Sequence, residues 1–200
     1  MAKIGLRQNS MKKIAITGGI GSGKSTVLDI LTNLGYPTMS SDAIVWELYK
    51  KRRIRKMLKQ LFPTAITGIR LKINKSLMAK EVFSNPEKHK LLTDLITPLV
   101  LEEILKRTKK LDKPCFVEVP LLFECGYDYC FDDVWVIVRN KKDRIDSVVK
   151  RSNLTEEQVV ARMNNQVNYD NLNLNGYTVI ENTGDLNALV QTIKTQLKNV

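Results

Sequence analysis

An α/β fold built around one parallel sheet is predicted by three features of the sequence. Short runs rich in β-branched and aromatic residues alternate with segments of helical periodicity. A glycine-rich turn separates the first such run from the first helical segment. The chain has 200 residues, which suits one core with an appended lobe better than two independent domains. We therefore expect helices on both faces of the sheet and a ligand site at the carboxyl ends of its strands.

The predicted sheet has five short strands. They span residues 12–17, 36–39, 115–119, 134–138 and 177–181. Helices are predicted where apolar residues recur at i, i+3, i+4 and i+7, first at 27–34 and last at 186–197. The first helix should end at Gly35, because glycine readily adopts the left-handed conformation of a helix C′ position.

The positive charge of the chain is concentrated in residues 50–113. The whole chain has a formal net charge of +11, whereas this segment alone has 18 Lys and Arg against 6 Asp and Glu, a net of +12. An apolar stripe at helical spacing is formed by Ile54, Met57, Leu58 and Leu61. A second helix around 91–105 should be kinked or divided at Pro98. We predict a basic helical insertion between the second and third strands.

The strongest motif is a phosphate-binding loop between the first strand and the first helix. The residues Gly18-Gly19-Ile20-Gly21-Ser22-Gly23-Lys24-Ser25-Thr26 match G-x-x-x-x-G-K-[ST] in full. Glycines let backbone N–H groups point at phosphate oxygens, and the helix N-terminus adds partial positive charge. Lys24 should span the β- and γ-phosphates, and the Ser25 hydroxyl should ligate Mg²⁺. The predicted nucleotide contacts are Gly19, Gly21, Ser22, Gly23, Lys24, Ser25 and Thr26.

A GTPase is the alternative that the loop alone leaves open. The run Asn140-Lys141-Lys142-Asp143 spells a guanine-reading motif directly after the fourth strand. A GTPase also needs an Asp-x-x-Gly that senses the γ-phosphate, and the third strand, Phe116-Val117-Glu118-Val119-Pro120, carries none. We therefore favour ATP as the nucleotide.

Phosphoryl transfer to a hydroxyl requires a carboxylate that accepts the proton. Asp42 is the leading candidate because it follows the second strand and should emerge at the same sheet edge as the loop. The competing interpretation is a helix N-cap, since Ser and Asp are ordinary residues there. Glu118, on a strand expected beside the loop strand, is the candidate for the water shell of Mg²⁺, with a structural role as its alternative.

A helical lid is predicted at residues 140–168, where two helical segments follow the fourth strand. Thr155 and Gln158 have the spacing of a capping box at the start of the second segment. Small-molecule kinases close such lids over ATP and bring guanidinium groups to its phosphates, so Arg151 and Arg162 are candidates, although exposed helix arginines usually have no such role. The predicted nucleotide-binding core comprises residues 11–49, 114–139 and 169–200.

These pieces resemble the dephospho-coenzyme A (dephospho-CoA) kinase family over nearly the whole chain from about residue 12. The spelling of the loop at 17–26 is similar to the family's, and Asp42 aligns with the second Asp of its Asp-Ala-Asp motif. The other similar pieces are Val82-Phe83-Ser84-Asn85-Pro86, Pro98-Leu99-Val100, Val119-Pro120-Leu121-Leu122-Phe123-Glu124, Arg151, Leu154-Thr155-Glu156-Glu157, Arg162, Gln166 and Val179-Ile180-Glu181-Asn182-Thr183-Gly184. The loop alone is widespread, but these pieces in this order are specific.

The resemblance implies a P-loop kinase in which the 50–113 insertion binds dephospho-CoA and 140–168 closes over ATP. The implied reaction transfers the γ-phosphoryl group of ATP to the ribose 3′-hydroxyl, the last step of coenzyme A biosynthesis. Asp42 is implied as the base and Asn182 as a contact on the adenine side. Arg151 is implied as a catalytic phosphate ligand together with Lys24, and Arg162 as a further phosphate ligand.

Four positions depart from the family pattern, in or beside the acceptor site. Ser40 replaces the first Asp of Asp-Ala-Asp, Trp46 stands where an Arg often follows, Asn74-Lys75 where Asp-Arg is common, and Thr97 where His precedes the proline. Either the acceptor is positioned differently or altered, or catalysis is weakened. The retained loop, base and lid residues favour a different positioning.

Other classes are disfavoured by composition. No run of about 18 apolar residues occurs, and the N-terminus lacks a secretory apolar region, so we expect a cytoplasmic protein with no membrane partner. Cys115, Cys125 and Cys130 with the single His89 are too few, at the wrong spacings, for a structural zinc site. Residues 1–10 precede a second methionine, Met11, and could be a tail, a tag or an upstream start.

The basic insertion also allows a nucleic-acid surface or a membrane-surface helix. No recognised nucleic-acid motif accompanies it, and aromatic residues for base stacking or membrane anchoring are scarce there. We expect a small-molecule substrate, no nucleic-acid partner, and a monomer or small homo-oligomer.

Overall fold

A computed structural model describes residues 11–152 and 154–200 of the chain. The segment 1–10, whose origin the sequence leaves open, lies outside the described residues. The described residues form two compact units, one made of those up to Ser40 and from Thr108 onward, the other of Ser41–Arg107. The second unit begins at Ser41, so residues 41–49, which the sequence prediction assigned to the core, belong to it.

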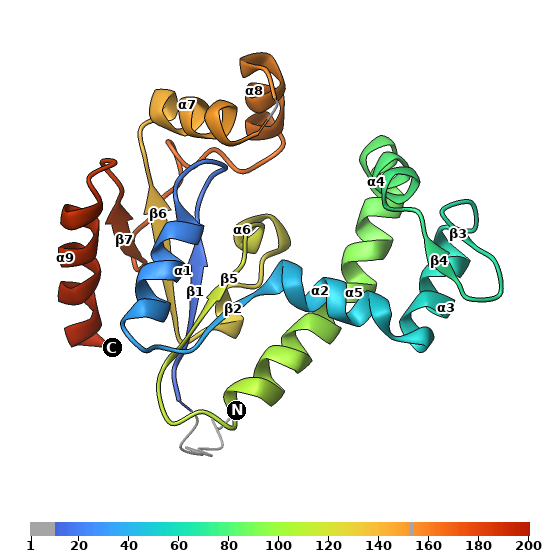
Figure 1. Cartoon of the computed structure of the whole chain (residues 1–200), viewed down its shortest axis with the longest axis horizontal. Coiled ribbons are helices and arrows are strands. Elements are labelled where there is room, and N and C mark those ends of the chain that lie inside the picture. Colours follow the sequence, from blue (N-terminus) through green and yellow to red (C-terminus); the bar gives the residue numbers. More distant parts are fainter. Residues whose placement is uncertain (1–10, 153) are drawn as a thin grey trace, which may run out of the picture. The chain divides into compact units, whose positions relative to one another are not determined.

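The first unit is built on the predicted five-stranded parallel sheet. Its strands are β1 (Lys13–Thr17), β2 (Thr38–Ser40), β5 (Cys115–Glu118), β6 (Asp133–Val138) and β7 (Thr178–Glu181). Their order in the sheet is β2-β5-β1-β6-β7, and every neighbouring pair is parallel (Figure 1). The expectation that Glu118 lies on the strand beside the loop strand is confirmed, because Glu118 pairs with Ile16 of β1. Parallel pairing places the carboxyl ends of all five strands at one edge.

Alternate residues of the central strands bury opposite faces of this sheet. Ile14 and Ile16 pack with Trp135 against helices α1 (Lys24–Asn33) and α9 (Leu186–Gln196). The intervening Ala15 packs on the other face, with Leu122 of α6 (Leu122–Cys125). Short 3₁₀ turns at Asp128–Cys130 and Leu197–Asn199 complete the unit. The sheet is thus covered on both sides, which fixes the edge from which the loops project.

Two helices follow β6, as predicted. They are α7 (Lys141–Arg151) and α8 (Glu156–Asn164). The predicted capping box opens α8: Gln158 N donates to Thr155 Oγ1 at 3.4 Å, and Thr155 N donates to Gln158 Oε1 at 3.0 Å. Ile20, from the loop after β1, packs with the apolar cluster that joins the two helices. This contact ties the helix pair to the loop.

The second unit contains four helices and a small hairpin. In chain order these are α2 (Ser41–Lys50), α3 (Arg52–Leu61), β3 (Ile66–Thr67), β4 (Lys72–Ile73), α4 (Lys75–Ser84) and α5 (Pro86–Thr108). Of the predicted stripe in α3, Ile54 and Leu58 are buried. The antiparallel pairing of β3 with β4 was not predicted from the sequence.

Of the two outcomes expected at Pro98, a kink or a division, the division does not occur. Helix α5 runs unbroken from Pro86 to Thr108 with Pro98 inside it. Proline removes one backbone donor and crowds the preceding turn, but side chains on both sides of it are buried at one-turn spacing, at Ile96, Val100 and Ile104. That burial holds the two halves in one helix. No helix among the described residues is long and apolar enough to cross a membrane.

Candidate active site

The glycine-rich segment after β1 forms a closely packed loop whose shape depends on missing side chains. Gly21 and Gly23 have φ of +78° and +99°, a region that favours glycine. A Cβ at Gly21 would collide with the carbonyl of Arg144, and one at Gly23 with the side-chain amide of Asn182. The loop is therefore enclosed by two residues that lie far apart in the sequence.

Lys24 is held against the loop that it follows. Its side chain is buried, and Nζ donates to the carbonyls of Gly18 and Gly19 at 2.8 and 3.1 Å. Helix α1 begins at Lys24 and has no acidic residue in its first turn. The positive end of the helix dipole and the ammonium group therefore favour an anion at this point. Ser25 is exposed in the same turn, and Thr26 is half-buried.

Asn182 supports the loop from the end of the last strand. Its side-chain Nδ2 donates to the Ser22 carbonyl at 2.8 Å, and its backbone N donates to Val138 O at 2.9 Å. Its Oδ1 accepts from Gly184 N at 3.1 Å. The side chain is buried, so the residue assigned to the adenine side by resemblance has a structural contact with the phosphate loop itself.

Arg144 is a site residue that sequence reasoning noted only as a cation near Arg151 and Arg162, without predicting its burial or its contacts. Its side chain is almost fully buried in α7, and Nη2 donates to both carboxylate oxygens of Asp170 at 2.8 and 2.9 Å. The guanidinium lies against Gly19, while its own Nε has no hydrogen-bond partner among the described residues. The burial of Arg144 could have been predicted from its place in the helix, because it shares a face of α7 with the buried residues Ile145 and Val148.

The segment that carries Asp170 makes two further contacts with the loop. Gln166 Oε1 accepts from the backbone N–H of Ile20 at 2.8 Å, and Tyr169 shares a 3.2 Å hydrogen bond with Thr17. Burial raises the pKa of the Tyr169 hydroxyl to about 12, so it stays protonated. A cavity of about 380 Å³ lies here, lined by Arg144, Gln166 and Tyr169 among others. The phosphate loop is thus braced before any ligand enters.

The predicted lid arginines have a different environment. Arg151 is the last residue of α7 and Arg162 lies in the last turn of α8, and both are exposed. Neither forms an ion pair with a carboxylate of the described chain. In the run 140–143, which spells a guanine-reading motif, Asn140 has a structural role. It caps α7 by accepting a hydrogen bond from Lys142 N at 2.9 Å.

Asp42 and Glu118 lie at the carboxyl ends of two strands that are neighbours in the sheet: Asp42 comes just after β2, and Glu118 is the last residue of β5. Asp42 is the second residue of α2, so it lies in the first turn of that helix rather than at the N-cap, and it is exposed. It lines a cavity of about 310 Å³ in the second unit. Glu118 ends β5 and pairs with Ser40, the last residue of β2. Asp42 therefore follows the end of the edge strand with a single residue between them.

Comparisons with known proteins agree on one family. The family model for dephospho-CoA kinase matches residues 12–188. A dephospho-CoA kinase of Thermus thermophilus is 36% identical over 185 residues, which are 92% of this chain and 89% of the relative. A crystal structure of a Thermus thermophilus protein, TT1252, has a TM-score of 0.84 at 34% identity over 95% of this chain and 98% of the other. The dephospho-CoA kinase of Campylobacter jejuni has a TM-score of 0.69 at 26% identity over 93% and 95%.

Proposed function

The chain belongs to the dephospho-CoA kinase family, and from this premise we propose how its own residues carry out the reaction. It is an ATP-dependent kinase that transfers the γ-phosphoryl group to the ribose 3′-hydroxyl of dephospho-CoA. The hydroxyl oxygen attacks Pγ, the bond from Pγ to the β–γ bridging oxygen breaks, and ADP leaves. We assign the departing hydroxyl proton to the Asp42 carboxylate.

The braced phosphate loop is the observation that carries the proposed phosphoryl transfer from ATP. Backbone N–H groups of the loop bind phosphate oxygens, except those of Ile20 and Ser22, which already donate to Gln166 and to the Gly19 carbonyl. Lys24 exchanges the carbonyls of Gly18 and Gly19 for β- and γ-phosphate oxygens. Because Gln166 and Asn182 already hold the loop backbone by hydrogen bonds, little reorganisation is needed when ATP binds. Arg151 and Arg162, which are exposed and carry no carboxylate partner in the described chain, then offset charge on the phosphoryl oxygens.

The side chains at the loop suit Mg²⁺. No group of three or more metal-ligating His, Cys, Asp or Glu side chains gathers among the described residues, so the protein would contribute few ligands. Mg²⁺ commonly keeps several waters and binds mainly through substrate phosphates. The exposed Ser25 hydroxyl would complete such a shell, with Glu118 orienting its waters. When bound, the ion neutralises charge on the β- and γ-phosphates.

Each segment of the chain is assigned one role. Residues 11–40, 114–139 and 169–200 bind the nucleotide, and 140–168 form the lid. Residues 50–113 bind dephospho-CoA together with 41–49, which the sequence prediction assigned to the core but which belong to the second unit. The positive charge of 50–113 supports the acceptor assignment, because dephospho-CoA carries a pyrophosphate. A cytoplasmic location and a monomeric or small homo-oligomeric state remain predictions.

Two substitutions with matched controls test the proposal. Asp42→Asn should lower kcat by about 10²–10⁴-fold while ATP binding is retained, since only proton transfer is impaired. Lys24→Ala should weaken ATP binding and turnover together. Asp29→Asn and Lys194→Ala, exposed on α1 and α9, make the same chemical changes away from the loop and should leave both unchanged. An Asp42→Asn variant with full kcat would exclude Asp42 as the base.

A further inference from the structure

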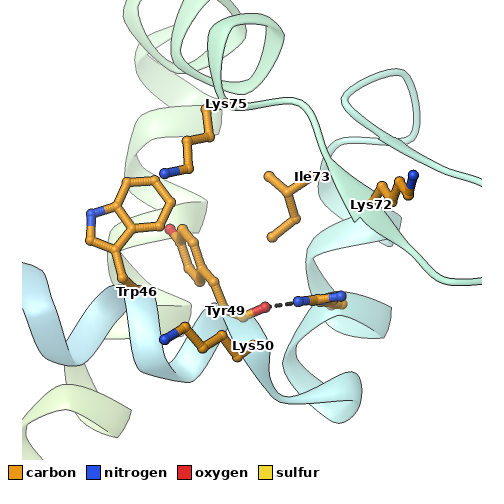
Figure 2. Close-up of a pocket in the computed structure, with 7 residues that line it drawn as sticks. Trp46, Tyr49, Lys50, Lys72, Ile73 and Lys75 are labelled. Atoms are coloured by element: carbon orange, nitrogen blue, oxygen red, sulfur yellow. Dashed lines mark hydrogen bonds between the residues drawn. The ribbon is translucent and has the colours of Figure 1, made fainter.

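A pocket of about 390 Å³ in the second unit combines aromatic and cationic walls (Figure 2). It is lined by Trp46, Tyr49, Lys50, Arg55, Lys72, Ile73 and Lys75. We propose that this pocket holds the diphosphate of the acceptor, and that the Trp46–Lys75 pair is its specificity-determining element. The inference rests on the proposed function, because it takes dephospho-CoA as the acceptor.

Two departures from the family pattern meet at this pocket. Trp46 and Lys75 are 29 positions apart in the sequence, yet Lys75 Nζ lies 3.8 Å from the centroid of the Trp46 ring. Tyr49 meets the same indole edge to face, with centroids 5.5 Å apart at 87°. The ring thus fixes the ammonium by a cation–π contact, where the family pattern would place two cations. The two departures therefore contact each other in the structure.

Among the described residues, acidic side chains offset little of the positive charge around the pocket: Lys50 interacts with Glu47, but that carboxylate is already paired with Arg107. Arg55 Nε donates to the Tyr49 carbonyl at 2.6 Å, which positions the guanidinium without cancelling its charge. Lys50, Lys72 and Lys75 form no ion pair with any carboxylate of the described chain. Uncompensated charges at a concave, partly apolar surface attract a compact anion. A diphosphate joined to an apolar or planar group would fit this pocket, with the diphosphate at the cationic wall and the attached group at the aromatic wall.

Helix α2 sets the distance between the proposed base and this pocket. Asp42, Trp46 and Lys50 follow one another at one-turn spacing, so Trp46 lies about 6 Å and Lys50 about 12 Å along the axis from Asp42. Asp42 lines an adjoining cavity that shares Trp46, Tyr49, Ile73 and Lys75 with the first. In dephospho-CoA the diphosphate is attached to the same ribose as the reacting 3′-hydroxyl. A ribose at Asp42 therefore directs its diphosphate toward Trp46 and Lys75.

Intrinsic fluorescence tests the pocket without turnover. The chain has two tryptophans, and Trp46 is 42% exposed whereas Trp135 is 1% exposed, so acrylamide should quench Trp46 selectively. Saturating dephospho-CoA, added without ATP, should reduce this quenching. Inorganic pyrophosphate should compete, adenosine should not, and Trp46→Phe should abolish the signal. Unchanged quenching at saturating dephospho-CoA would overturn the proposal.

Steady-state kinetics give a second readout. Lys75→Ala should raise the KM for dephospho-CoA about tenfold with the KM for ATP unchanged, as expected for loss of about 1.4 kcal/mol of binding. Lys80→Ala, exposed on the same helix and outside the pocket lining, is the matched control. Equal KM values for the two variants would overturn the proposal. Absence of turnover in the unaltered protein, despite protection of Trp46, would instead count against the proposed function.

Discussion

Replacement of Asp170 by asparagine should destabilise the protein beside the phosphate loop. The Arg144 side chain is 6% exposed, and its charge is matched by Asp170 through bonds of 2.8 and 2.9 Å. The Asp170→Asn substitution would keep the size of the side chain but leave a buried cation without a counter-ion. Breaking a fully buried pair costs roughly 3–5 kcal/mol and losing an exposed one under about 1 kcal/mol. Because the Asp170 side chain is 52% exposed, we expect about 2 kcal/mol.

The assay is urea unfolding, with thermal unfolding as a second measure. A loss of about 2 kcal/mol corresponds to a fall in Tm of roughly 4–8 °C for a chain of this size. Since the guanidinium lies against Gly19, the KM for ATP should rise as well. Asp146→Asn, on the exposed side of α7, is the control for the same chemical change.

A double variant makes the reasoning refutable. Arg144→Met combined with Asp170→Asn removes both charges, and it should be more stable than Asp170→Asn alone because no buried cation is left unpaired. If Asp170→Asn and Asp146→Asn differ by less than about 0.5 kcal/mol, or if the double variant is the least stable, the buried pair does not brace the loop as described.

Three further predictions concern the loop, a tyrosine and a thiol. Gly23→Ala should lose ATP binding, and it should lose more stability than the control Gly176→Ala. Both glycines have positive φ (+99° and +89°), but only at Gly23 would the added Cβ meet a neighbour, the Asn182 side chain. Equal losses of stability would contradict the close approach of Asn182. Burial raises the pKa of Tyr169 to about 12, against about 10 in the unfolded chain. Its contribution to the free energy of unfolding is therefore complete below pH 10 and is lost between pH 10 and 12. Tyr169→Phe should flatten this decline, and an unaltered slope would refute the prediction. Burial raises the pKa of the Cys115 thiol to about 11, so iodoacetamide at pH 8 should modify the partly exposed Cys125 and Cys130 first, as peptide mass spectrometry would show; early modification of Cys115 would contradict its burial.

The parallel sheet was predictable because its signals are local. Each strand is a short run of β-branched or aromatic residues, and the phosphate loop has a fixed spacing between strand and helix. The capping box at Thr155 and Gln158 likewise needs only two side chains three residues apart. The hairpin β3–β4 has strands of two residues each, too short for any periodicity, so its pairing is set by the surrounding packing.

The missed parts of the site depend on contacts between distant residues. In the sequence, Arg144 looks like an ordinary exposed cation of a helix. Its burial follows from its contacts with Gly19 and Asp170, which are far from it in the sequence. Trp46 and Lys75 were singled out by the resemblance, but their contact could not be predicted because 29 positions separate them in the sequence. The helix is not divided at Pro98, one of the two outcomes expected there, because burial along α5 outweighs the loss of one backbone hydrogen bond.

The identity of the phosphorylated product tests the central claim most directly. The purified protein is incubated with Mg·ATP and dephospho-CoA, and the acceptor is examined by phosphorus NMR while ADP is measured in parallel. The account predicts a new ribose 3′-phosphate monoester and one ADP for each coenzyme A formed. ADP without a phosphorylated acceptor, or no transfer by a protein that binds both substrates, would contradict it.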